Sequence, residues 1–111
     1  PRAVMAAASF LTAEVVTPRK TLAIDADRTY QDLALVFFAR VDPEHTVRVR
    51  WPHFRERIEV APPDVVVLFT HGQLAHEPWV TLRGRLLTMA GDTYVERAGF
   101  SYPVRVFERM P

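Results

Sequence analysis

The chain has 111 residues, a formal net charge of +1 from 14 basic and 13 acidic side chains, and 49% hydrophobic residues. This length suits one domain with its own core, and the balanced composition excludes a disordered chain and gives no overall charge for nucleic acid or membrane binding. Without cysteine there is no disulfide or thiol chemistry, and the longest apolar run, Val65 to Phe69, is too short to span a bilayer.

The amino-terminal residues are alanine-rich, with one arginine and no acid before Glu14. We predict an N-terminal extension over residues 1–9 and a single α+β domain over residues 10–111. Three interpretations of the extension stay open: the remnant of an organelle-targeting signal, the cut end of a shortened chain, or an ordered piece of a longer one.

Two short segments after this extension have the composition of strands. Residues 10–16 (FLTAEVV) and 21–24 (TLAI) carry β-branched side chains with partial alternation, and the sequence TPRK between them suits a turn. We therefore expect these segments to pair as a hairpin.

The next segment, TYQDLALVFFAR, predicts a helix over about residues 30–41. Its apolar side chains recur at the spacing of one helix face: Tyr30, Leu33, Ala34, Phe37, Phe38 and Val41. Thr29 and Asp32 have the spacing of a capping box, and Arg40 falls where a helix end favours positive charge. Asp42-Pro43 then ends the helix, because a residue before proline avoids the helical region.

The remaining chain reads as strands. Residues 46–51 (TVRVRW) and 54–60 (FRERIEV) alternate and are expected to form a second hairpin, whereas the continuous β-branched run at 64–69 indicates a strand buried on both faces. Further strands are predicted over residues 79–89, 93–100 and 102–108. The fold class is therefore α+β: a mostly antiparallel sheet with one helix packed on it.

The order strand, strand, helix, strand, carried by KTLAID, TYQD and TVRVRW, resembles the opening of a ubiquitin-like β-grasp. That resemblance implies a hairpin crossed by a helix, and it covers less than half of the chain. An OB-like barrel built mainly from residues 46–108, or a sandwich, is the alternative. None of these folds fixes a function.

No constellation of side chains predicts catalysis, a cofactor or a metal. His71, His76 and Glu77 share a loop, but their spacing matches no metal-binding motif. Asp25 and Asp27 fit a turn in which side chains bond their own backbone. We therefore predict no catalytic, cofactor-binding or metal-ligating residue.

Arginine supplies 13 of the 14 basic residues. If residues 46–51 and 54–60 pair, several arginines share one strand face, and two more follow on a later strand. This candidate surface for a polyanion or a protein partner consists of Arg48, Arg50, Arg55, Arg57, Arg83 and Arg85. Arginine binds carboxylates and phosphates in a bidentate manner.

The leading functional hypothesis is a non-catalytic protein-interaction or structural module, such as a small subunit or accessory domain of a larger assembly. It follows from the missing catalytic motifs and from a strand content whose edges a partner would cover. The alternative is a domain that binds single-stranded nucleic acid or RNA through the arginines, and the third is a small enzyme with a loop-built site. We expect a soluble intracellular protein, in the cytoplasm or an organelle matrix, with a protein partner and no membrane span.

Overall fold

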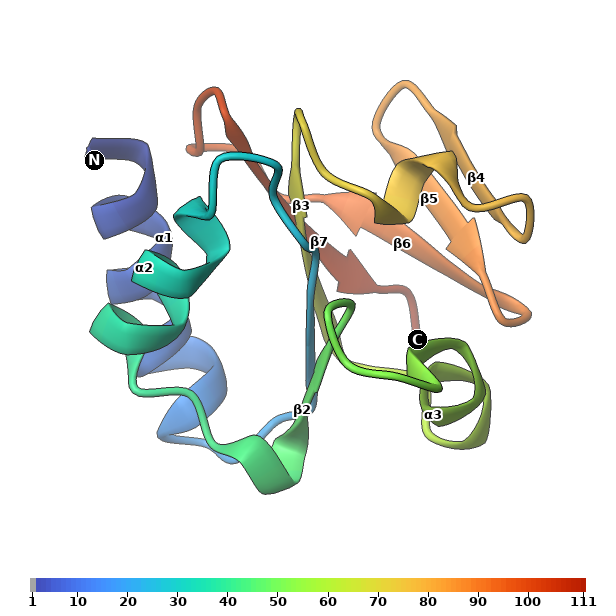
Figure 1. Ribbon diagram of the computed structural model, residues 1–111, viewed down its shortest axis with the longest axis horizontal. Helices are drawn as coiled ribbons and strands as arrows, with labels where there is room; N and C mark the ends of the chain where they lie inside the picture. The colour runs from blue at the N-terminus through green and yellow to red at the C-terminus, as the bar shows by residue number, and fades with distance from the viewer. Residues whose placement is uncertain (1) are drawn as a thin grey trace.

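Seven strands form one mixed sheet that curls like half a barrel (Figure 1). The computed structural model describes residues 2–111, and the strands lie side by side in the order β2-β1-β3-β7-β6-β5-β4. Their bounds are β1 Leu22–Ile24, β2 Thr46–Arg48, β3 Val65–Phe69, β4 Val80–Arg83, β5 Leu86–Met89, β6 Asp92–Glu96 and β7 Val104–Arg109.

Three α-helices flank this sheet: α1 Arg2–Leu11, α2 Gln31–Ala39 and α3 Phe54–Val60. A π-helical turn at Thr12–Val16 continues α1, and 3₁₀ turns occupy Pro43–His45 and Leu74–His76. Helices α1 and α2 pack together on one side of the sheet, and α3 lies on the other (Figure 1).

The sheet is parallel in one half and antiparallel in the other. Strand β1 pairs in parallel with both β2 and β3, whereas β3, β7, β6, β5 and β4 pair antiparallel. Parallel neighbours need a crossover, and α2 and α3 supply the two crossovers, from β1 to β2 and from β2 to β3. The carboxyl ends of β1, β2 and β3 consequently meet at one edge.

Each face of the sheet carries its own hydrophobic cluster. In β3, Val65, Val67 and Phe69 point into the cluster that α1 and α2 cover, and Val66 and Leu68 point into the cluster that includes α3. Because both faces are covered, all five residues are buried. The continuous apolar run at 65–69 is therefore a strand buried on both faces, as the sequence predicted.

The α+β class, the mostly antiparallel sheet and a helix within residues 30–41 are confirmed, and the curled sheet agrees with the barrel-like alternative. The strand predicted over residues 79–89 is two strands, since Arg83-Gly84-Arg85 turns the chain and Gly84 has a φ of 58°. The predictions for residues 64–69 and 102–108 match β3 and β7 closely, and residues 92–96 form β6.

Both predicted hairpins in the first half of the chain are wrong. Residues 10–16 finish α1 and its π turn, because Leu11 and Val15 extend the buried stripe of that helix. Residues 54–60 form α3, in which Phe54 and Ile58 lie one turn apart and face the core. The β-grasp layout therefore does not form, and three α-helices replace the one expected.

The amino-terminal segment also differs from expectation. Within the predicted extension 1–9, residues 2–9 belong to α1, and Ala3, Val4, Ala7 and Ala8 lie in the same buried cluster as β1 and β3. Small alanine side chains let two helices approach closely, which is how α1 packs beside α2. Pro1 is outside the described residues.

Helix α2 is capped differently from the predicted capping box. The Gln31 N–H donates to Asp27 Oδ2 at 3.0 Å, and the Thr29 hydroxyl donates to the same carboxylate oxygen. Tyr30, at the N-cap position, has a φ of 65°. Asp27 is therefore the residue that caps α2, and Asp32 is free for another role.

Candidate functional site

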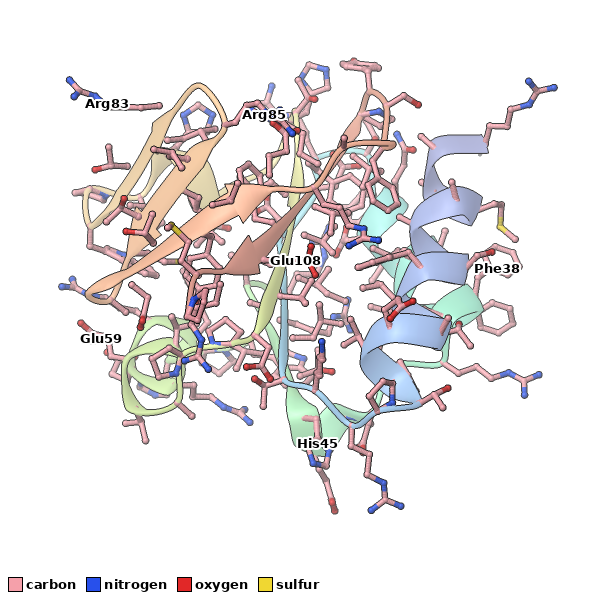
Figure 2. The ribbon with its side chains drawn as sticks, turned by 180° about the vertical axis from the view of Figure 1, so that it is seen from behind. Phe38, His45, Glu59, Arg83, Arg85 and Glu108 are labelled. Atoms are coloured by element: carbon pink, nitrogen blue, oxygen red, sulfur yellow. The ribbon has the colours of Figure 1, made fainter. Side chains whose placement is uncertain are left out.

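Four of the six apolar residues that predicted α2 are exposed, whereas Ala34 and Val41 pack against the core. Phe37 is 74% exposed, Phe38 51% and Leu33 44%, and the two phenyl rings meet edge to face with centroids 5.3 Å apart. We call Leu33, Phe37 and Phe38 the α2 outer face. In Figure 2, Phe38 lies at the outer side of the helix layer and points away from the sheet.

The opposite side of α2 meets the core through apolar residues smaller than phenylalanine: Ala34, Leu35, Val36 and Ala39. Leu35 and Ala39 are fully buried there, and Asp32 is buried with them. The helix position was predictable from its periodicity, but the orientation was not, because the most apolar face lies toward solvent. The signal that could have shown this is Asp32, which shares the inner face with Leu35 and Ala39 at helical spacing.

A buried ion pair fixes this orientation. Arg50, from the turn after β2, donates from Nε to Asp32 Oδ2 at 2.6 Å and from Nη2 to Asp32 Oδ1 at 2.8 Å. Its Nη2 also donates to the Asp27 carbonyl at 2.6 Å, and the Asp27 N–H donates to Asp32 Oδ1 at 3.1 Å. The Asp32 side chain is 1% exposed, and rotating α2 would separate this carboxylate from Arg50 and break both hydrogen bonds.

These contacts set the charge state of Asp32. Burial alone would raise the pKa of this carboxyl, but the hydrogen bonds from Arg50 and from the Asp27 N–H outweigh burial and hold the pKa below its usual value. Asp32 is therefore ionised at neutral pH.

The six candidate arginines lie in three separate places. Arg50 and Arg48 turn toward Asp32, with Arg48 Nη2 3.6 Å from Asp32 Oδ2. Arg83 and Arg85 lie on either side of Gly84, and Arg83 is at the far end of the molecule from Phe38 (Figure 2).

The remaining pair, Arg55 and Arg57, is on α3. Arg55 pairs with Glu59 at 3.5 Å and its guanidinium also lies over the Trp79 ring, while that of Arg57 lies over the Trp51 ring. The shared strand face does not exist because residues 54–60 are helical.

Comparisons with protein-family models, with curated proteins and with solved structures find no match to this chain. Over residues 2–111, none of the helices has the length and apolar character needed to cross a membrane. Within the same range, no group of three or more His, Cys, Asp or Glu side chains is placed to hold a metal ion.

Proposed function

We propose that this chain is a non-catalytic protein-interaction module that docks on a protein partner through the α2 outer face, as a small subunit or accessory domain does in a larger assembly. The observation that carries this proposal is the exposure of Phe37, Phe38 and Leu33 together on one helix. Contiguous exposed apolar side chains mark interaction sites in folded proteins, whereas isolated ones need no explanation.

The energy available at this face is sufficient for a specific contact. Phe37 is 74% exposed. Burying that fraction removes roughly 150 Å² of apolar surface from water, and burying a phenylalanine side chain contributes about 1.5–3 kcal/mol before the cost of association. Phe37 is therefore expected to be the main anchor, with Phe38 and Leu33 beside it. Amphipathic helices use such anchors, one turn apart, to bind apolar grooves.

The charges beside α2 indicate the chemistry of the partner. Arg40 caps the carboxyl end of α2, and within residues 2–111 it forms no salt bridge. Its N–H donates to the Phe37 carbonyl at 3.3 Å, so this arginine lies at the end of the helix that carries Phe37 and Phe38. A partner with an apolar groove rimmed by carboxylates complements this arrangement, whereas a two-fold contact with a second copy would bring like charges together.

The proposal is tested by photo-crosslinking in a native extract. A benzoyl-phenylalanine residue replaces Phe37 in one variant and Val60 in the control variant, since Val60 is 86% exposed on α3. We expect one stoichiometric protein product from position 37 that is absent from position 60. The identified partner should then bind the purified chain, and Phe37→Ser should weaken binding at least tenfold without changing the unfolding midpoint.

Charge reversal provides the second criterion. Arg40→Glu should weaken binding to the identified partner and reduce its dependence on salt, while Arg83→Glu, at a distant turn, should leave both unchanged. The proposal is contradicted if both positions crosslink equally, or if Phe37→Ser leaves the affinity for the partner unchanged. If the chain forms a dimer and Phe37→Ser dissociates it, the assignment of an acidic partner is contradicted. The α2 outer face then binds a second copy of the chain.

A further inference from the structure

A second feature, independent of the α2 outer face, is a crevice at the carboxyl ends of the parallel strands. Strand β1 lies between β2 and β3, so the chain leaves β1 to one side through α2 and then returns to the other side through α3 (Figure 1). Ligands of open α/β sheets bind where the strand order reverses in this way. Here that position holds a cavity of about 350 Å³, lined by residues that follow all three strands.

The walls of this crevice are fixed by a buried carboxylate. Asp25, directly after β1, accepts the Phe69 N–H at Oδ2 and the Gln73 and Leu74 N–H groups at Oδ1, each at 2.8–3.0 Å. Gly72 lies so close that an added Cβ would stand 1.8 Å from Asp25 Oδ2. The loop after β3 is thereby held against β1.

The crevice lining combines charges of both signs. Asp27 and Glu77 supply carboxylates, and Arg28 and Arg50 supply guanidinium groups. Within residues 2–111, neither Arg28 nor Glu77 forms a salt bridge, so each keeps an unpaired charge at the crevice wall.

The cationic groups are similarly available. The Nε and Nη2 atoms of Arg50 are bonded to Asp32 and to the Asp27 carbonyl, which leaves its Nη1 edge for a ligand. The Tyr30 ring lies 4.8 Å from the Arg50 guanidinium carbon and limits its motion. A guanidinium held in this way is preorganised to bind a carboxylate.

The arrangement does not suit a phosphate at the start of α2. Asp27 Oδ2 already accepts the Gln31 and Thr29 N–H groups, so a carboxylate of the chain itself occupies the place where a phosphate would bind. Arg50 is paired with Asp32 and Asp27 caps α2, so Arg28 and Glu77 are left as two unpaired charges of opposite sign in a lining that also contains His71 and His76. A ligand with one charge of each sign matches this wall better than an anion or a cation.

We propose that this crevice binds a small zwitterion of the α-amino-acid type. The ligand carboxylate contacts Arg28 and Arg50, and the ligand ammonium donates to Glu77. No covalent step is involved.

The test uses ¹H–¹⁵N NMR titration of the whole chain with the twenty common L-amino acids. We expect at least one to bind with a Kd of about 1 mM or tighter, with shifts concentrated at residues 26–28, 50 and 71–77. Propionate and ethylamine, which each carry half of the zwitterion, should bind at least tenfold more weakly than the best amino acid, and inorganic phosphate should give no localised shifts.

Two wall variants complete the test. Arg28→Gln and Glu77→Gln should each weaken binding at least tenfold, while Arg83→Gln, on the distant turn, should leave the Kd unchanged. Each variant is first shown to retain the wild-type spectrum outside the crevice, so a loss of binding does not reflect unfolding. The proposal is overturned if no amino acid gives localised shifts, or if propionate or phosphate alone binds with equal affinity. It is also overturned if both wall variants leave the Kd unchanged. Because Phe37→Ser leaves these residues intact, the titration and the crosslinking can fail independently.

Discussion

Replacing Arg50 with methionine tests whether the buried ion pair holds α2 in its outward-facing orientation. The change removes two charged hydrogen bonds to Asp32, at 2.6 and 2.8 Å, and one to the Asp27 carbonyl at 2.6 Å. Breaking a buried pair by removing one partner costs about 3–5 kcal/mol. The Arg50 side chain is 28% exposed and Asp32 keeps the Asp27 N–H, so we expect a loss near the lower limit, about 3 kcal/mol.

The measurement is urea unfolding at neutral pH, followed by the fluorescence of Trp51 and Trp79. Arg48→Met, at the end of β2, is the matched control, because Arg48 Nη2 lies 3.6 Å from Asp32 Oδ2 without a hydrogen bond. That variant should lose no more than about 1 kcal/mol.

A double-mutant cycle isolates the pair itself. Combining Asp32→Ala with Arg50→Met should give a coupling energy of about 2 kcal/mol, since the second change no longer strands a buried charge. The reasoning is refuted if Arg50→Met costs less than about 1 kcal/mol, matches Arg48→Met, or shows no coupling to Asp32→Ala.

Four further outcomes concern buried polar groups and a glycine packed against one of them. Gly72→Ala should destabilise the fold by at least about 2 kcal/mol in urea unfolding, because its Cβ would stand 1.8 Å from Asp25 Oδ2. Tyr94→Phe should cost about 1–2 kcal/mol by the same assay, since the Tyr94 hydroxyl donates to a buried carbonyl at 2.8 Å. Folding lowers the pKa of Asp32 from an ordinary 3.8, so the stabilisation that Asp32 gives is present above that value and is lost as the pH falls through the folded pKa. The free energy of unfolding, measured between about pH 5 and pH 2, should therefore fall with pH in the wild type and fall less in Asp32→Ala. Burial raises the pKa of Asp25, against the lowering by hydrogen bonds from Phe69, Leu74 and Gln73, so this group acts in the opposite direction, and Asp25→Ala should steepen the acid loss.

Much of the architecture followed from the sequence pattern. The β-branched run at 65–69 requires burial on both faces, and the periodicity of residues 30–41 requires a helix in almost any context. The strand predictions failed at 10–16 and 54–60 because alternation over so few residues also fits a helix. In α3, the pair Phe54 and Ile58 and the ion pair of Arg55 with Glu59 both have helical spacing, but the β-branched and aromatic content outweighed them in the prediction.

The candidate sites could not be predicted from the sequence in this way. Arginine content drew attention to Arg48 and Arg50, yet these side chains turn inward to Asp32, which is eighteen positions from Arg50 in the sequence. The crevice likewise joins residues that follow three different strands, and only the parallel order of β2, β1 and β3 brings them to one edge. No local pattern encodes that proximity.

By itself, then, the sequence determined the α+β class, the central buried strand and the presence of α2, because periodicity and β-branching act over a few neighbouring residues. Only the tertiary structure decided which side of α2 meets the core. Apolar spacing alone favours burying Phe37 and Phe38, but the long-range pair of Asp32 and Arg50 places those rings in solvent, since a buried carboxylate requires its partner and an exposed phenyl ring requires none.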